Sequence, residues 1–198
     1  MTPVSVRKVA NVLNLLVLIA LICNIILIYL VPVAVVSLEL TDGTGLLAGV
    51  AEYLSSFLHS GEDDILAASA AASLLAWFWC WKSPTALVLT MFLVISGICT
   101  AVILQQGRRV LATILQGTPF SMENAAALRR AAGAAFIIAA AALVRVVFSV
   151  CFFHSPLPIL TYNALFVPIF SMFGLLCLVM SALFRQAAEM KAENDLTI

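Results

Sequence analysis

Residue types that bind metal ions gather in one short polar stretch of the chain. Imidazole and carboxylate groups hold zinc or calcium only at spacings that let several of them reach one ion. The spacing here matches no recognised zinc or calcium pattern, so we expect a solvated loop and no metal site. Asp64 is then available to cap the helix that follows. The residues concerned are His59, Glu62, Asp63 and Asp64, with His154 as the second histidine of the chain.

Catalytic motifs are absent from the sequence. The chain contains no GxSxG nucleophile motif, no phosphate-binding loop, no HExxH zinc motif and no pair of carboxylates within an apolar stretch. Each of these arrangements supplies a group that reacts or that holds a reacting atom. We therefore predict a protein that is not an enzyme and that has no cofactor.

The composition indicates that lipid is the solvent of this chain. Of its 198 residues, 64% are hydrophobic and 10% are charged, and the mean hydropathy is +1.14. A soluble domain usually has about 45–50% apolar and about 25% charged residues. One globular core cannot hide this much apolar surface, so we expect the lipid bilayer as the main partner. The net charge is zero, which predicts no direct binding of nucleic acid.

Four long apolar stretches predict an all-α integral membrane protein with a single membrane domain, residues 1–198. The first stretch runs 28 residues without a charge, which is about 42 Å of helix against about 30 Å of hydrocarbon. It is too long for the apolar region of a cleaved signal peptide. The predicted segments are spans at about 9–36, 84–106, 131–153 and 159–184, an outer loop 37–83, a cytoplasmic connector 107–130 and a cytoplasmic tail 185–198.

The basic residues set the direction of the spans. If residues 65–81 do not cross the membrane, almost all basic residues outside the spans are cytoplasmic, and Lys82 is outside. If that stretch crosses, four arginines are exported together, against the positive-inside rule. Its 17 residues reach about 25 Å, at the lower limit for a span. We therefore expect both termini in the cytoplasm, together with Arg7, Lys8, Arg108, Arg109, Arg129, Arg130, Arg185 and Lys191.

The outer loop is acidic and has helical periodicity. Apolar residues recur at helical spacing within residues 46–58, which predicts an amphipathic helix at the outer interface. Residues 65–81 are expected to be interfacial or re-entrant, and whether they cross the membrane stays open. Cys80 and Cys151 both fall near the outer boundary, so a disulfide between them also stays open, because spacing cannot supply the required geometry.

Polar residues within the spans have two interpretations. Asparagine amides such as Asn11, Asn14 and Asn24 usually hydrogen-bond across helices, although intramembrane polar groups also mark transport paths. Arg145 lies about 12 Å of helix from the outer end of its span, so its side chain can extend outward, or it can act as a functional cation. Asn24 and Arg145 are therefore candidate intramembrane polar sites.

Two polar stretches have a pattern that is more specific than hydropathy. Helix-capping residues account for part of the first stretch, where Gly117 ends one helix and Ser121 begins the next. Both stretches resemble the signature of the DUF2975 family, which comprises small four-span bacterial membrane proteins with no established activity. The resemblance covers about residues 105–198. The stretches are Gly117-x-Pro119-Phe120-Ser121-x-Glu123-Asn124-x3-Leu128-Arg129 and Phe184-Arg185-x3-Glu189-Met190-Lys191-x-Glu193-Asn194-Asp195-Leu196-Thr197-Ile198.

The resemblance implies a bacterial inner-membrane protein with a regulatory partner, because such genes often lie beside a small helix-turn-helix regulator of the Cro/CI type. The alternatives are that the connector stretch is only a well-capped helix start, or that the chain is a small exporter or an immunity-type membrane protein. Four spans are few for a transporter unless it forms a homo-oligomer, which remains possible. The candidate partner-binding residues are Pro119, Phe120, Ser121, Glu123, Asn124, Arg129, Glu193, Asn194, Asp195, Leu196 and Thr197.

Overall fold

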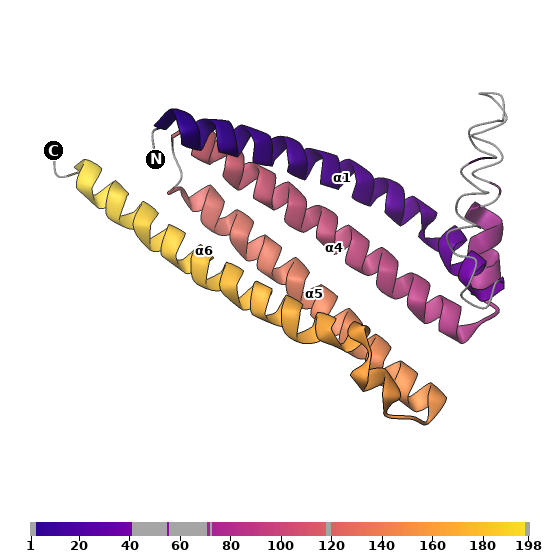
Figure 1. Ribbon diagram of the computed structural model, residues 1–198. Helices are drawn as coiled ribbons and strands as arrows, with labels where there is room; N and C mark the ends of the chain where they lie inside the picture. Colours follow the sequence, from indigo (N-terminus) through magenta and orange to yellow (C-terminus); the bar gives the residue numbers. More distant parts are fainter. Residues whose placement is uncertain (1–2, 41–54, 56–70, 72, 118–119, 197–198) are drawn as a thin grey trace. The chain divides into compact units, whose positions relative to one another are not determined.

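The computed structural model describes residues 3–40, 55, 71, 73–117 and 120–196. This part of the chain is built from helices and contains no strand, which confirms the all-α prediction (Figure 1). The elements are α1 (Pro3–Leu40), α4 (Pro84–Leu115), α5 (Met122–Phe153), the 3-10 helices η1 (Leu157–Leu160) and η2 (Tyr162–Leu165), and α6 (Phe166–Leu196).

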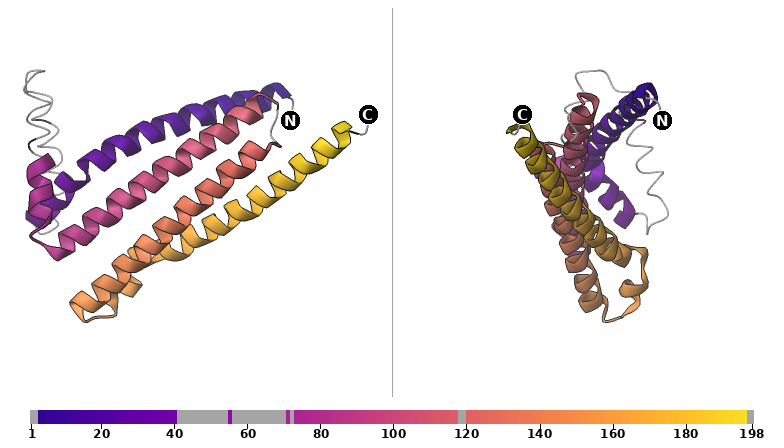
Figure 2. Two further views of the ribbon diagram at one scale, coloured as in Figure 1. Left: turned by 180° about the vertical axis from the view of Figure 1, so that it is seen from behind. Right: turned by 90° about the vertical axis from the view of Figure 1, so that its left-hand side faces the viewer.

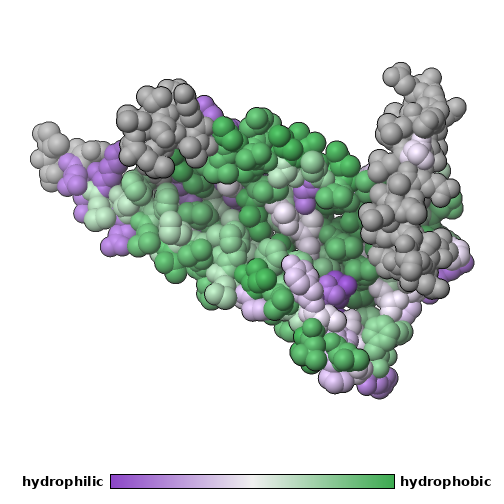
Figure 3. Space-filling view, viewed as in Figure 1, coloured by the Kyte–Doolittle hydropathy of each residue, from purple (hydrophilic) through white to green (hydrophobic). Residues whose placement is uncertain are grey.

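Within the described residues, four helices are long and apolar enough to cross a membrane, as predicted. Large apolar side chains on them face outward: Leu16 is 56% exposed, Ile26 52% and Leu176 61%. Figure 3 shows hydrophobic residues over much of the visible face. Scattered exposed apolar residues are normal in soluble proteins, but continuous cover of this kind requires lipid. The candidate spans are Asn11–Val36, Pro84–Leu115, Met122–Phe153 and Tyr162–Asn194.

The α-helix of the fourth span begins at Phe166, seven residues after the predicted start at Ile159. The two 3-10 helices η1 and η2 occupy the intervening residues. The prolines of this segment lack a backbone N–H and cannot donate an α-helical hydrogen bond. Thr161 adopts an extended conformation (φ −81°, ψ 156°), which interrupts the helix. Hydropathy alone cannot show this boundary, because the turns are as apolar as the helix that follows them.

The described residues group into two compact units, residues 1–25 with 96–198 and residues 26–95. In the first unit, α5 and α6 lie side by side along most of their length (Figures 1 and 2). Small residues spaced by four on α5 are buried, which allows a neighbouring helix to approach closely. Ala131, Ala135 and Ala139 are all buried.

Gly174 of α6 lies against the Phe136 side chain of α5. A Cβ atom added to Gly174 would lie 3.0 Å from Cζ of Phe136, and two further ring atoms would lie at 3.1 and 3.2 Å. The Phe136 ring therefore packs directly on the glycine backbone. Small residues allow helices in lipid to approach closely enough for van der Waals contact to hold them together.

Helix α4 also packs against α5 in the first unit. Cys99 of α4 forms a buried cluster with Ala134 and Ile138 of α5, and Phe170 of α6 packs against the same cluster. On α1, the Oδ1 atom of Asn14 accepts a hydrogen bond from Nε of Arg108 at 3.4 Å. At Asn14, the amide thus links two helices, which is the usual role of such groups in membranes.

In the second unit, residues 26–95, Val35, Cys80 and Ala86 form a small buried core. Ser83 caps α4: its Oγ atom accepts a hydrogen bond from the Ala86 N–H at 3.4 Å, and Pro84 is the first residue of the helix, as predicted. Cys80 and Cys151 are both free thiols. The predicted amphipathic helix of residues 46–58 lies almost entirely outside the described residues.

Candidate functional site

The α4–α5 connector is the polar segment to which sequence and structure both draw attention. Helix α4 ends at Leu115, and Gly117 has φ +78°, a left-handed conformation that glycine adopts without steric cost. The Gly117 N–H donates to the carbonyl oxygen of Ile114 at 3.1 Å, which closes the last turn. The predicted helix stop is therefore confirmed.

Ser121 is the N-cap of α5, as predicted. Its backbone is extended (φ −132°, ψ 151°), and its Oγ atom accepts a hydrogen bond from the Asn124 N–H at 3.3 Å. Glu123 lies in the first turn, where the helix dipole favours a carboxylate. These contacts fix the direction in which α5 leaves the connector.

Asn124 links α5 to α4. Its side chain is 1% exposed, and its Nδ2 atom donates to Oγ1 of Thr113 at 2.6 Å. The Thr113 hydroxyl in turn donates to the carbonyl oxygen of Val110 at 2.8 Å. Asn124 was predicted as a partner-binding residue, but its burial gives it a role between two helices of this chain. A partner could reach it only if α4 and α5 separated.

Phe120 joins the connector to the end of α6. Its ring centroid lies 5.4 Å from that of Phe184, with an angle of 47° between the ring planes. One turn earlier on α6, the Ser181 hydroxyl donates to the carbonyl oxygen of Ala125 at 2.6 Å. The structure therefore brings together the beginnings of the two stretches that carry the family resemblance, although 64 residues separate Phe120 from Phe184 in the chain.

Helix α6 continues through the tail to Leu196. Nε of Arg185 forms an exposed ion pair with Oε1 of Glu189 at 2.9 Å. Glu193 and Asn194 are exposed on the same helix. Asp195 and Leu196 belong to the helix by their backbone, whereas the predicted site residues Pro119 and Thr197 lie outside the described residues.

A groove of about 370 Å³ opens between the first turns of α5 and the last membrane turns of α6. Apolar side chains, including Met122 and Leu178, form part of its wall. Two arginines also line it, Arg129 from α5 and Arg185 from α6, of which Arg185 is paired with Glu189. We call this feature the α5–α6 groove. Arg129 is thus the one candidate partner-binding residue that lines it.

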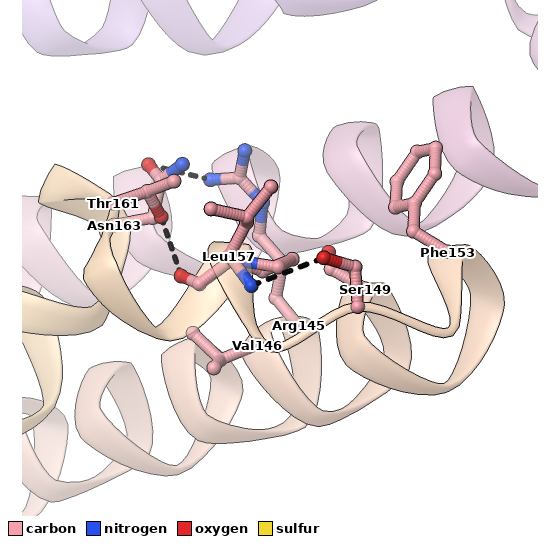
Figure 4. Close-up of a pocket in the computed structure, with 9 residues that line it drawn as sticks. Arg145, Val146, Ser149, Phe153, Leu157, Thr161 and Asn163 are labelled. Atoms are coloured by element: carbon pink, nitrogen blue, oxygen red, sulfur yellow. Dashed lines mark hydrogen bonds between the residues drawn. The ribbon is translucent and has the colours of Figure 1, made fainter.

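Arg145 lies at the other end of α5, beside a cavity of about 470 Å³ (Figure 4). Its Nη1 atom donates to Oδ1 of Asn163 in η2 at 3.2 Å. Ser149 and Thr161 also line the cavity. The acidic outer loop lies largely outside the described residues. Asn163 was missed by sequence reasoning, because only the 3-10 turns return it to α5.

The other candidate intramembrane residue, Asn24, is partly buried on α1. Its Oδ1 atom is buried and has no hydrogen-bond partner among the described residues. Asn24 therefore differs from Asn14, whose amide oxygen accepts the bond from Arg108. Whether Asn24 serves packing, as such amides usually do, or marks a functional path stays untested.

No group of three or more potential metal ligands occurs among the described residues. The stretch from His59 to Asp64 lies outside them, so the prediction for that loop stays a prediction. His154 is described: it follows α5 as its C-cap in the left-handed conformation, with φ 50°. Its backbone role is to end the helix before the turn that leads to η1.

The four apolar helices define a multi-pass helical membrane protein. The chain belongs to the family described as "Protein of unknown function (DUF2975)", which it matches over residues 64–198. This match confirms the resemblance of the connector and tail stretches. No match is found among the curated proteins or among the solved structures.

Proposed function

We propose that this chain is a non-enzymatic protein of the bacterial inner membrane that binds a small helix-turn-helix regulator of the Cro/CI type. The binding surface combines the connector with the end of α6, on the cytoplasmic side. One observation carries the proposal: the Phe120 and Phe184 rings, 5.4 Å apart, join the two stretches that resemble the family signature. The connector and the end of α6 are thereby part of one surface.

Exposed apolar side chains at this junction support a protein partner. Phe120 is 53% exposed and Met122 is 52% exposed. Phe120 precedes α5, and Met122 is its first residue. Both are therefore farther from the membrane than Arg129 and Arg130, which are expected at the lipid headgroups. Large apolar side chains that face water next to one another are typical of sites where proteins bind each other.

The residues that line the α5–α6 groove indicate which kind of partner surface would bind there. Arg129 and Arg185 flank an apolar floor that includes Met122 and Leu178. A helix or loop that presents an apolar side chain between acidic residues would complement this groove in shape and charge. The α6 tail, with Glu193 and Asn194 exposed, would add a polar rim to the same interface.

Co-purification with the regulator that a neighbouring gene encodes tests this proposal. The regulator is captured with the intact chain, with a form truncated after Phe184, and with a Phe120→Ala/Arg129→Gln variant. Loss of a central apolar anchor and a charge usually lowers affinity by about fivefold or more. We expect that loss in recovery for both altered forms.

Phe153→Ala is the matched control, because Phe153 is an equally exposed aromatic residue (60%) at the opposite end of α5. Its recovery of the regulator should equal that of the intact chain. Recovery that does not change in the truncated form, or no recovery with any form, would sink the proposal.

The alternative function is that of a small exporter or an immunity-type membrane protein. The cavity beside Arg145 and the buried unpartnered amide oxygen of Asn24 favour it, because polar groups at bilayer depth can mark a path. Arg145→Leu and Asn24→Leu would then abolish a flux or resistance phenotype at normal protein levels. A phenotype that survives both substitutions excludes this alternative.

A further inference from the structure

A second polar cavity, of about 550 Å³, lies between the last turns of α4 and the first turns of α5. We call it the α4–α5 pocket. It adjoins the α5–α6 groove, with which it shares Ala126, but neither Arg129 nor Arg185 lines it. Its charged and polar lining includes Gln106 and Arg109 from α4, and Glu123 and Arg130 from α5.

Helix lengths place this pocket at the depth of the lipid headgroups. From Pro84 to Gln106, α4 rises about 33 Å, and from Arg130 to Phe153, α5 covers about 35 Å. The hydrocarbon core is about 30 Å thick, and both helices are apolar over these stretches. Gln106 and Arg130 therefore lie within about one helical turn of the boundary between hydrocarbon and headgroups.

Gln106 supplies a buried polar group to which a ligand could donate a hydrogen bond. It is 5% exposed, and its Oε1 atom is buried without a hydrogen-bond partner among the described residues. A buried carbonyl oxygen without a donor is unfavourable, and most such groups in proteins are paired with protein, water or ligand. Gln106 lines the pocket, so a hydroxyl that entered the pocket could donate to this oxygen.

The charges of the pocket indicate the sign and the magnitude of the charge that a ligand should carry. Neither Arg109 nor Arg130 forms an ion pair with another described residue. Glu123 contributes one negative charge, so the two arginines leave a net charge of +1. A phosphodiester carries one negative charge and matches this balance, whereas a phosphate monoester would carry nearly two.

We propose that the α4–α5 pocket binds the headgroup of an anionic phospholipid of the phosphatidylglycerol type. Arg109 and Arg130 hold the phosphodiester, as paired guanidinium groups do in other phosphate sites. A glycerol hydroxyl of the headgroup donates to Oε1 of Gln106. The acyl chains continue along the apolar surface of the span. Basic pockets between membrane helices are known to select lipid headgroups in this way.

Native mass spectrometry of the full chain in detergent tests the proposal. The chain is equilibrated with phosphatidylglycerol, with phosphatidylethanol, which has the same charge but no headgroup hydroxyl, and with zwitterionic phosphatidylcholine of the same acyl chains. A basic residue near an anionic lipid contributes about fivefold in affinity, so Arg109→Gln/Arg130→Gln should lower phosphatidylglycerol retention by about 25-fold. Gln106→Leu should lower retention of phosphatidylglycerol but not of phosphatidylethanol.

Arg129→Gln is the matched control, since it removes the same charge from the neighbouring position outside the pocket. It should retain phosphatidylglycerol within about twofold of the unaltered chain, and Arg109→Lys/Arg130→Lys should show that the charge, not the fold, is responsible. An equal loss with Arg129→Gln, equal retention of phosphatidylcholine, or no loss with Gln106→Leu would overturn the proposal. Displacement of the lipid by millimolar inorganic phosphate would do the same, because it would assign the pocket to a soluble anion.

Discussion

The contact between Gly174 and Phe136 allows a sharp test of how α5 and α6 pack. In Gly174→Ala, the new methyl group would meet three ring atoms at 3.0–3.2 Å, closer than ordinary van der Waals contact. Overpacking of this kind typically costs about 1–3 kcal/mol. Replacement of a helical glycine by alanine otherwise gains about 0.5–1 kcal/mol. We therefore expect a net loss of about 1 kcal/mol in the free energy of unfolding.

Gly133→Ala provides the matched control on α5. A Cβ atom added to Gly133 has no neighbour within 4 Å, so only the gain in helix propensity should remain. The difference between the two alanine variants removes that gain and isolates the clash, which should be about 1–3 kcal/mol. The assay is equilibrium unfolding of the purified chain in mixed micelles, followed by far-ultraviolet circular dichroism.

A double-mutant cycle assigns the clash to the ring. Phe136→Leu shortens the side chain, so Gly174→Ala should cost clearly less in that background than in the unaltered chain. If Gly174→Ala stabilises the chain as much as Gly133→Ala does, Phe136 does not pack on the Gly174 backbone and the reasoning fails.

Three other predictions concern the connector. Asn124→Leu removes the bond to Thr113 and should cost about 1 kcal/mol of unfolding free energy, with no change if the two helices are not linked there. Ser121→Ala removes the cap of α5 and should cost about 1 kcal/mol, with faster hydrogen exchange confined to its first turn. In a chain without native thiols, single cysteines at Ser121 and Asn194 should be shielded from an impermeant reagent in intact cells, and one at Ser60 should react. Labelling at Ser121 from outside would overturn the predicted topology.

Local features of this fold could be predicted from the sequence because their causes are local. The helix stop at Gly117 depends on one residue that tolerates a positive φ, and the start at Ser121 depends on one side chain that reaches its own helix. The spans follow from run length and hydropathy in the same way. Each of these predictions needs no knowledge of which other helix lies nearby.

Which side chains meet between two helices could not be predicted, because this depends on how each helix is rotated about its axis. Asn124 belongs to a motif that fits a binding surface, yet its rotation turns it toward Thr113. In the sequence, Asn163 is a polar residue within an apolar stretch, and nothing there indicates its partner. Only the turns η1 and η2 bring it back to Arg145. The sequence pattern identifies which residues are polar, and only the packing shows which of them are already used.

Arg129 and Arg130 are adjacent in the chain, and each lines one of the two proposed sites. Separate substitutions of the two residues therefore test the two sites independently. Adjacent residues on an α-helix point about 100° apart. Arg130 accordingly lines the pocket toward α4, and Arg129 lines the groove toward α6. The positive-inside rule counts both residues alike, so topology alone cannot distinguish their roles. Arg130→Gln should therefore weaken lipid retention while the regulator still co-purifies, and Arg129→Gln should do the reverse. If both variants lose both partners, the two arginines act only as a shared positive field, and neither site is as specific as the geometry indicates.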